Sequence, residues 1–357
     1  MEMACKGIDN MNKDTRNINI DILRIMAAAF VFLVHLGQWS GYPKNAENGF
    51  YGVWLFFILS GYLIFESLDK YERLNWNNVK DYYKKRIVRI IPLYWSVLIF
   101  IWIFDLLKNV VLERIPLNSA IEVDGVCGIK FIRYFVFGQM LIPSDNYDLW
   151  NNRYVLWTMS AFALFYILAP IIKKISDSFI KSLVVLLVFY EINNYIPNVI
   201  RRVLSGKYGD SLESFPELNA LCVMYLFWIG VCAYYAIKEK KTVIYAVILV
   251  TGYSFYILRG TEYEVMFVVL LMIATSTNMQ IKNEKIKSAV ALVSKCSFPL
   301  YLTHIIWFDI VTRLCGFIGI GAGIRFLLYV IGAMAVAYIT YRLITPLENK
   351  LRSILLR

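Results

Sequence analysis

The two histidines of this sequence are its first candidates for chemistry, because both lie within long apolar stretches. His35 and His304 are the only imidazoles in the chain. An ionisable side chain at membrane depth is costly, and by default it faces the interior of a helix bundle or a water-filled cavity. Since the pKa of imidazole lies near neutrality, such a group can accept and return a proton. The alternative for each histidine is a neutral ring that is hydrogen-bonded to a neighbouring helix.

Arg24 lies on the same apolar stretch as His35. Eleven residues at about 100° each complete three turns, so the two side chains share one helix face, roughly 16 Å apart along the axis. That length is about half the hydrocarbon thickness of a bilayer. Arg24 is therefore predicted at the cytoplasmic boundary, where a guanidinium can hold an anion, and His35 near mid-membrane, where it can move a proton. In the alternative, Arg24 is a snorkelling arginine paired with Asp21 one turn before it.

A basic segment, residues 82–89, precedes Pro92. Proline suits the first turn of a helix, so a membrane span is predicted to start near Pro92. Arg86 and Arg89 are three residues apart and share a helix face, where their guanidinium groups can fork around phosphate oxygens, with Lys85 beside them as a further candidate. The alternative is that these charges only mark a cytoplasmic loop.

These residues need a membrane-embedded scaffold, and the composition supplies one. The 357 residues are 59% hydrophobic, against about 45–50% in a soluble domain. Roughly 210 apolar side chains can form about ten spans of about 20 residues each, which excludes an ordinary soluble globule. The net charge of +11 is explained first by cytoplasmic loops rather than by nucleic acid. The apolar stretches lie near residues 22–39, 50–65, 90–107, 154–172, 180–196, 219–237, 242–258, 264–278, 297–316 and 324–344.

Basic residues set the orientation of these ten predicted spans. With both termini in the cytoplasm, 24 of the 37 Lys and Arg residues fall on inner segments and 12 on outer segments, and Arg24 lies inside a span. This two-to-one bias follows the positive-inside rule. The predicted fold is an all-α polytopic integral membrane protein of about ten transmembrane helices with both termini cytoplasmic. The first span is predicted to be uncleaved, because its small residues lie inside the apolar run rather than after it.

A single membrane domain accounts for the chain. The predicted organisation is a cytoplasmic segment at residues 1–20, a transmembrane domain at 21–345 and a cytoplasmic tail at 346–357. Residues 129–142, within the largest outer segment, 108–153, are apolar but short. Treating them as an eleventh span removes the charge bias, so an interfacial or re-entrant piece is predicted. The six cysteines are dispersed, with no C-x-x-C pair and no neighbouring histidine, so no metal site is expected.

Three blocks in the first hundred residues resemble one family of membrane proteins. They are NIDILRIMAAAFVFLVH (residues 19–35), FFILSGYLI (residues 56–64) and YYKKRIVRIIPLYW (residues 82–95). Their order and spacing resemble those of the acyltransferase family 3 membrane proteins. Later stretches fit as well, among them LWTMSAFALFYILAPII (residues 156–172) and SFPLYLTH (residues 297–304). The resemblance covers essentially the whole chain.

The resemblance implies a reaction. Members transfer an acyl group, usually acetyl, from cytoplasmic acyl-coenzyme A to a hydroxyl of an extracytoplasmic sugar or another cell-envelope acceptor. The arginine and histidine that are essential in their first span correspond to Arg24 and His35. The implied location is the cell membrane, crossed several times, and the implied partners are acyl-coenzyme A, a cell-envelope glycan and the lipid bilayer.

The resemblance also implies where the donor binds. The family's two-arginine loop, the expected docking site for the phosphates of coenzyme A, corresponds to Arg86 and Arg89, with Lys85 beside them. The Ser-Gly pair of its second span corresponds to Ser60 and Gly61. Acyl-coenzyme A, most simply acetyl-coenzyme A, is then a donor substrate, and no permanently bound cofactor or metal is expected.

His35 is expected to act as the general base that removes the proton of the acceptor hydroxyl, with a transient acyl-histidine as the alternative role. His304 is expected to position the acceptor or to polarise the carbonyl. The sequence departs from many members at two places. Phe162 and Ala163 replace a glutamate of the fourth span, as in a branch concerned with surface polysaccharides, and Thr345 replaces a glutamate before the proline of the last span.

Two other functions compete with acyl transfer. One is a transporter or flippase for a lipid-linked saccharide or a small solute, and the other is a catalytically inactive membrane module that binds a partner. Transporters tend to show inverted repeats, and no convincing repeat relates the two halves of this sequence. Nucleic-acid binding is not expected, and the sequence leaves the oligomeric state open.

Overall fold

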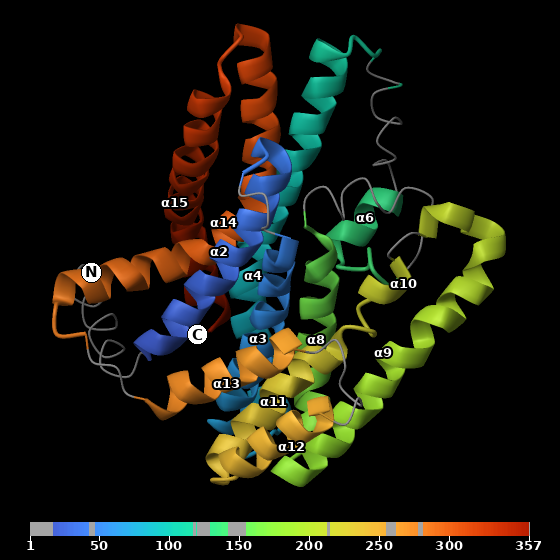
Figure 1. Cartoon of the computed structure of the whole chain (residues 1–357), viewed down its shortest axis with the longest axis vertical. Coiled ribbons are helices and arrows are strands. Elements are labelled where there is room, and N and C mark those ends of the chain that lie inside the picture. The colour runs from blue at the N-terminus through green and yellow to red at the C-terminus, as the bar shows by residue number, and fades with distance from the viewer. Residues whose placement is uncertain are drawn as a thin grey trace.

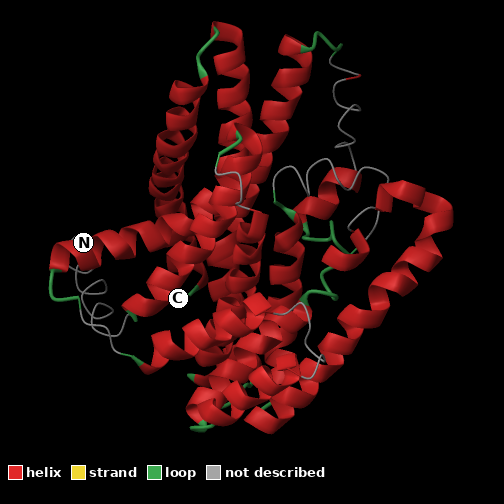
Figure 2. Cartoon of the chain, in the orientation of Figure 1, coloured by secondary structure: helices red, strands yellow, loops and turns green. Residues whose placement is uncertain are grey.

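The computed structural model of the chain describes residues 17–42, 47–116, 119, 129–141, 155–212, 215–254, 262–277 and 281–356. Within these ranges all regular secondary structure is helical, as Figures 1 and 2 show. The predicted class of an all-α protein is confirmed for the described residues. Several helices contain an apolar stretch long enough to cross a membrane, and helices satisfy their backbone hydrogen bonds within themselves, as a membrane domain requires.

Among the described residues, ten apolar helices coincide with the ten predicted spans. Six are long and apolar enough to cross a bilayer: α2 (Ile18–Ser40), α3 (Gly52–Asp69), α4 (Trp76–Leu107), α9 (Phe179–Tyr208), α14 (Glu284–Ile318) and α15 (Ala322–Leu355). Four are shorter: α8 (Trp157–Lys173), α11 (Met224–Lys238), α12 (Thr242–Ser254) and α13 (Glu262–Ser276). The number of membrane crossings and the side on which the termini lie stay predictions.

Local chemistry fixes where several long helices begin and end. Asn17, Asn75 and Asn283 precede α2, α4 and α14, and each side-chain oxygen accepts a hydrogen bond from a backbone N–H of the first turn. Each bond satisfies a donor that has no partner within the helix. α2 and α14 both end at a glycine, Gly41 and Gly319, in the left-handed conformation. Glycine adopts this conformation without a steric penalty, and it stops the helix there.

α4 begins earlier than the sequence predicts. The helix starts at Trp76 and continues through Pro92, so Pro92 does not lie in a first helical turn, and the start of the membrane span near it stays a prediction. Proline removes one backbone hydrogen bond and crowds the preceding turn. Membrane helices tolerate this where neighbouring groups satisfy the freed carbonyl. As a result, Arg86 and Arg89 lie on a continuous helix rather than in a loop, and the helix holds their side chains one turn apart.

α14 changes direction along its length. Figure 1 shows its first part running crosswise and its second part standing upright beside α15. Pro299 lies inside this helix, and proline is a common cause of a sharp kink. The predicted span at 297–316 matches the upright part only, whereas the helix itself begins at Glu284. The bend brings the turn around Ser294 and Ser297 to the centre of the helix bundle.

α3 and α11 approach each other closely at two glycines. A Cβ atom at Gly61 would lie 1.9 Å from the carbonyl oxygen of Phe227, and one at Gly230 would lie 1.9 Å from that of Ile58. Only residues without a side chain allow two helix backbones to come this close. The ring of Phe57 stacks on Phe227 beside the crossing, with centroids 4.6 Å apart. This contact lies in the main apolar core and fixes the position of α3.

The outer segment between α4 and α8 is described in part. Its central piece is the short helix α6 (Ile129–Phe135), far below the roughly 20 residues of a membrane span. The Tyr94 hydroxyl of α4 donates a hydrogen bond to the Tyr134 carbonyl at 3.0 Å. Residues 117–118, 120–128 and 142–154 lie outside the described part. The remaining short elements are η1 (Glu47–Tyr51), η2 (Lys108–Leu112), η3 (Gly209–Leu212) and α10 (Phe215–Leu218).

Candidate functional site

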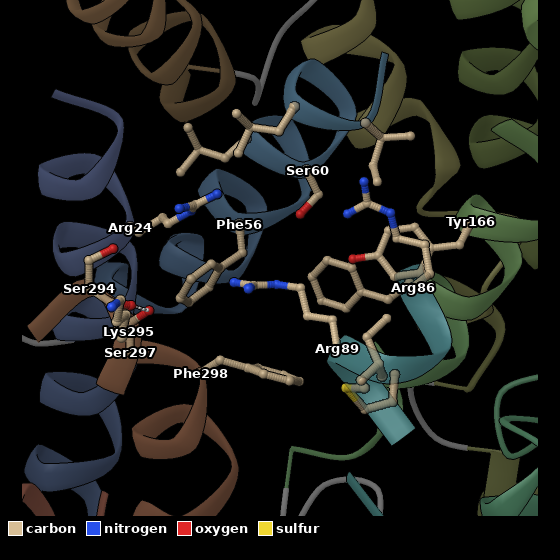
Figure 3. Close-up of a pocket in the computed structure, with 16 residues that line it drawn as sticks. Arg24, Phe56, Ser60, Arg86, Arg89, Tyr166, Ser294, Lys295, Ser297 and Phe298 are labelled. Carbon is tan, nitrogen blue, oxygen red and sulfur yellow. Dashed lines mark hydrogen bonds between the residues drawn. The ribbon is translucent and has the colours of Figure 1, made fainter. Parts of the chain in front are cut away.

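A cavity rich in cationic side chains lies where five helices converge. Its volume is about 130 Å³, and its walls come from α2, α3, α4, α8 and α14. Arg24, Arg86, Arg89 and Lys295 line it, and none of the described residues that line it is a carboxylate. Figure 3 shows the guanidinium groups of Arg24, Arg86 and Arg89 directed into one space. Four positive charges without a lining carboxylate make this cavity a site for an anion.

Arg24 is tied in place by a buried carboxylate. Its Nη1 lies 3.4 Å from Oδ1 of Asp21, whose side chain is 2% exposed. The Ser294 hydroxyl donates to the same oxygen at 2.8 Å, so Asp21 also joins α2 to α14. The expected pairing of Arg24 with Asp21 is therefore present, and the same side chain also lines the cavity; that it holds an anion stays a prediction. Within the described ranges, no ion pair joins the other three cations to a carboxylate.

Arg86 is oriented by neutral neighbours. Its Nη2 donates to the Ser67 hydroxyl at 3.1 Å, and its guanidinium carbon lies 5.3 Å from the Tyr82 ring centroid and 5.9 Å from that of Tyr166. Its Nε is buried and has no hydrogen-bond partner. A buried donor without an acceptor is costly.

The five predicted donor-binding residues do not all reach the cavity. Ser60, Arg86 and Arg89 line it. Gly61 instead packs against Phe227 in the α3–α11 crossing, because adjacent residues point about 100° apart around a helix. Lys85 lies outside the lining, with its Nζ 2.7 Å from a carboxylate oxygen of Asp81 and 3.1 Å from the Tyr71 hydroxyl.

α14 contributes cavity residues that sequence reasoning missed. Ser294, Lys295 and Ser297 all line the cavity, whereas the positive-inside rule counts Lys295 only as a cytoplasmic charge. The available signal was the cluster of small polar residues within an otherwise apolar run directly before Pro299. Tyr166 of α8 lies in the stretch at residues 156–172 that resembles the family, but the sequence predicts no role for it. Its hydroxyl points toward the same space in Figure 3.

The two histidines meet across the α2–α14 interface. The ring centroids of His35 and His304 are 5.3 Å apart, although the residues lie at opposite ends of the sequence. His304 is 1% exposed, and its Nδ1 is 2.9 Å from the Leu300 carbonyl oxygen. His35 is half-buried. Two imidazoles at this distance can act on one substrate.

The cationic cavity and the histidine pair occupy two levels of the same helices. Phe56 lines the cavity and packs edge-on against Tyr301, with centroids 5.6 Å apart. The Tyr301 ring is in turn 6.4 Å from that of His304. Along α2, Arg24 and His35 are separated by roughly 16 Å of helix. Aromatic rings therefore lie between the cationic cavity and the histidine pair.

No metal centre is found among the described residues, where His, Cys, Asp and Glu nowhere gather in groups of three or more. The cysteines in these ranges are free thiols: Cys222, Cys232 and Cys315 are buried, and Cys296 is partly buried. Cys5 and Cys127 lie outside the described part. The polar side chains at the cavity and the histidine pair are cations, hydroxyls and imidazoles.

The fold and the site together define a multi-pass helical membrane protein with a cation-lined cavity and a histidine pair. The chain belongs to the acyltransferase 3 family, whose acyltransferase domain matches residues 17–342. The resemblance seen in the sequence is thereby confirmed. The long apolar helices and the family place the protein in the cell membrane.

The chain is similar to several acetyltransferases. It is 25% identical over 332 residues to the O-acetyltransferase OatA of Staphylococcus aureus (strain NCTC 8325 / PS 47), covering 84% of this chain and 52% of that protein. It is 25% identical to the putative acetyltransferase ORF330 of Acidianus two-tailed virus, covering 85% of each. It is 28% identical to the putative peptidoglycan O-acetyltransferase YrhL of Bacillus subtilis (strain 168), and the match covers 58% of this chain and 33% of that protein. The chain spans about half the length of the OatA proteins that it matches. No solved structure matches it.

Proposed function

We propose that this protein transfers an acyl group, most simply acetyl, from cytoplasmic acyl-coenzyme A to a hydroxyl of an extracytoplasmic cell-envelope glycan. The observation that carries the proposal is the cavity lined by four cations and no carboxylate, two of whose five helices, α2 and α14, also carry the histidine pair. Coenzyme A carries phosphates at one end and its thioester at the end of a long arm. A donor of this shape suits an anion site and a proton-transfer site at two levels.

The cavity residues are proposed to bind the phosphates. Arg86 and Arg89 approach from α4, while Arg24 and Lys295 approach from α2 and α14. Charge-assisted hydrogen bonds from guanidinium groups to phosphate are shorter and stronger than neutral ones. Ser60 adds a hydroxyl to the same wall.

His35 is proposed to act as the general base. Its imidazole takes the proton of the acceptor hydroxyl as the oxygen attacks the thioester carbonyl. The tetrahedral intermediate then expels the coenzyme A sulfur, which leaves as the thiolate and receives the proton from the imidazolium. His304 is proposed to position the acceptor or to polarise the carbonyl. A transient acyl-histidine on His35 would use the same ring and is the alternative route.

The acceptor is proposed to be a cell-envelope glycan, and peptidoglycan fragments are the first acceptor to test. The names of the relatives support this choice, since one is called a peptidoglycan O-acetyltransferase and another an O-acetyltransferase. No permanently bound cofactor is required for this reaction. A transporter remains the alternative function, and it would not cleave a thioester.

The test measures release of the coenzyme A thiol by the purified full chain, supplied with acetyl-coenzyme A and peptidoglycan fragments. We expect Arg86→Gln and Arg89→Gln each to raise the KM for acetyl-coenzyme A roughly 10- to 100-fold, because each variant loses one hydrogen bond to a charged phosphate. Lys181→Gln is the matched control, because its ion pair with Asp177 is largely exposed. His35→Ala should abolish transfer while the protein stays in the membrane.

Three results would contradict the proposal. The wild-type chain would release no thiol and would not be stabilised against heat by acetyl-coenzyme A. Alternatively, Arg86→Gln and Arg89→Gln would behave like the Lys181→Gln control. Near-normal turnover by His35→Ala would remove the proposed base.

A further inference from the structure

Gln38 lies one turn after His35 on α2, and its side-chain oxygen faces the imidazole. The Oε1 atom is 2.9 Å from Nδ1 of His35. With Oε1 facing the ring, Nδ1 carries the hydrogen and donates it, because an amide oxygen can only accept a hydrogen bond. When the ring is neutral, Nε2 then holds the lone pair and is the basic atom of His35.

His304 has the same proton arrangement. Its Nδ1 donates to the backbone carbonyl of Leu300 at 2.9 Å, so its Nε2 also holds a lone pair. That Nε2 is buried without a hydrogen-bond partner in the described structure. The acceptors on the two helices therefore favour the same tautomer in both rings. The acceptor is the Gln38 side chain for His35 and the Leu300 backbone carbonyl for His304.

We propose that Gln38 is a positioning residue that holds His35 in the Nδ1–H tautomer and so makes Nε2 the atom that takes the acceptor's proton. This inference rests on the proposed role of His35 as base. When Nε2 binds a proton, the ring becomes an imidazolium, and the carbonyl dipole of Gln38 stabilises the charge at Nδ1. In Ser-His-Asp triads a carboxylate orients histidine in this way.

The Gln38 amide provides an acceptor oxygen without adding a charge to the helix. His35 lies within a helix that is apolar enough to cross a bilayer, where charges are costly, whereas position 38 is exposed and can also hold a carboxylate oxygen. The titratable group that faces His35 from the packed helix α14 is His304, which supplies no negative charge. Gln38 thus provides the acceptor, and its exposed position lets the side chain reach the ring without being locked into the core.

The tautomer can be measured directly because the chain contains only two histidines. The full-length protein is labelled with ¹⁵N-histidine, placed in lipid vesicles of phosphatidylglycerol and phosphatidylethanolamine at a pH that keeps both rings neutral, and examined by solid-state NMR. We expect both rings to carry the hydrogen on Nδ1. Gln38→Leu should move one ring toward the Nε2–H form, whereas Gln38→Glu, which keeps an acceptor oxygen, should not.

A kinetic measurement separates positioning from substrate contact. Gln38→Leu should lower kcat for thiol release from acetyl-coenzyme A roughly 10- to 100-fold, the usual effect of losing a group that orients a functional histidine, and should leave KM unchanged. Gln38→Glu should recover most of the activity. Asn194→Leu, which removes an exposed amide from α9, is the control and should match the wild type.

The inference is overturned if Gln38→Leu leaves both tautomers unchanged, or if the wild-type chain shows an Nε2–H ring. It is also overturned if Gln38→Leu raises the KM for the glycan acceptor at constant kcat, which would make Gln38 an acceptor contact. Failure of the proposed function would look different, since the wild-type chain would then release no thiol while the NMR measurement still reports the tautomer.

Discussion

Replacing Gly61 by alanine tests whether the α3–α11 crossing controls the cavity. The new Cβ would lie 1.9 Å from the Phe227 carbonyl oxygen and 2.8 Å from its carbonyl carbon. Both atoms belong to the backbone, so no rotamer change can relieve the clash. Ordinary van der Waals contact begins at 3.4 Å, so the helices must separate by about 1.5 Å to lengthen the 1.9 Å distance between the new Cβ and the Phe227 carbonyl oxygen to that value.

The expected cost is that of an overpacked core, about 1–3 kcal/mol of unfolding free energy. The effect on activity should be larger. Ser60 and Leu63 of α3 line the cavity, so a shift of α3 away from α11 moves this wall relative to Arg86. A misplacement of about 1 Å can cost roughly 100-fold in rate. We therefore expect thiol release from acetyl-coenzyme A to fall by about two orders of magnitude.

The assay is thermal unfolding of the purified protein together with the rate of thiol release. Gly206→Ala is the matched control, because no atom lies within 4 Å of a Cβ at this position in α9. Alanine in an exposed helix gains about 0.5–1 kcal/mol over glycine, so the control should be slightly more stable and fully active. If Gly61→Ala keeps the wild-type melting temperature and rate, the close approach does not determine the site.

Two further predictions concern polar contacts at the ends of α3 and α11. Asp69→Asn should lower the unfolding free energy by about 1–3 kcal/mol, because Lys173, 2.8 Å away and largely buried, loses its carboxylate. Asp177→Asn, whose ion pair is exposed, should cost far less in the same melting assay. The hydrogen bond from Lys241 lowers the pKa of Glu239 below its usual value of 4.5, so its stabilisation is complete above that value and is lost as the pH falls through the lowered pKa. In melting curves recorded at decreasing pH, Glu239→Gln should lose part of the acid sensitivity, and an unchanged pH dependence would contradict this.

The positions of the helices could be predicted from the sequence because apolar length and charge bias are local signals. All ten predicted spans coincide with helices of the described chain. The errors concern proline. Pro92 was compatible with a helix start and with a helix interior, and only packing decides between them. Pro299 gave no signal that α14 extends thirteen residues before the predicted span and bends there.

The candidate site was predictable where one helix carries it. The helical repeat places Arg24 with His35, and Arg86 with Arg89, from spacing alone. The contribution of Lys295 and the meeting of His304 with His35 depend on how α14 packs against α2, which no local pattern encodes. Spacing also did not show that Ser60 and Gly61 have different surroundings. Ser60 lines the cavity, whereas the adjacent Gly61 packs against α11.

The two-level arrangement sets a requirement on the donor. Arg24 and His35 are roughly 16 Å apart along α2, so one molecule engages both only if a long arm separates its phosphates from its acyl group. In the proposed reaction, binding energy gained at the cations would hold the acyl carbon beside the imidazole. Acetyl phosphate carries the same acyl group on a short phosphate and cannot span the two levels. We expect it to support transfer at less than about 1% of the rate with acetyl-coenzyme A, because it loses the roughly 100-fold benefit of positioning. Equal rates with the two donors would mean that the cationic cavity does not bind the donor.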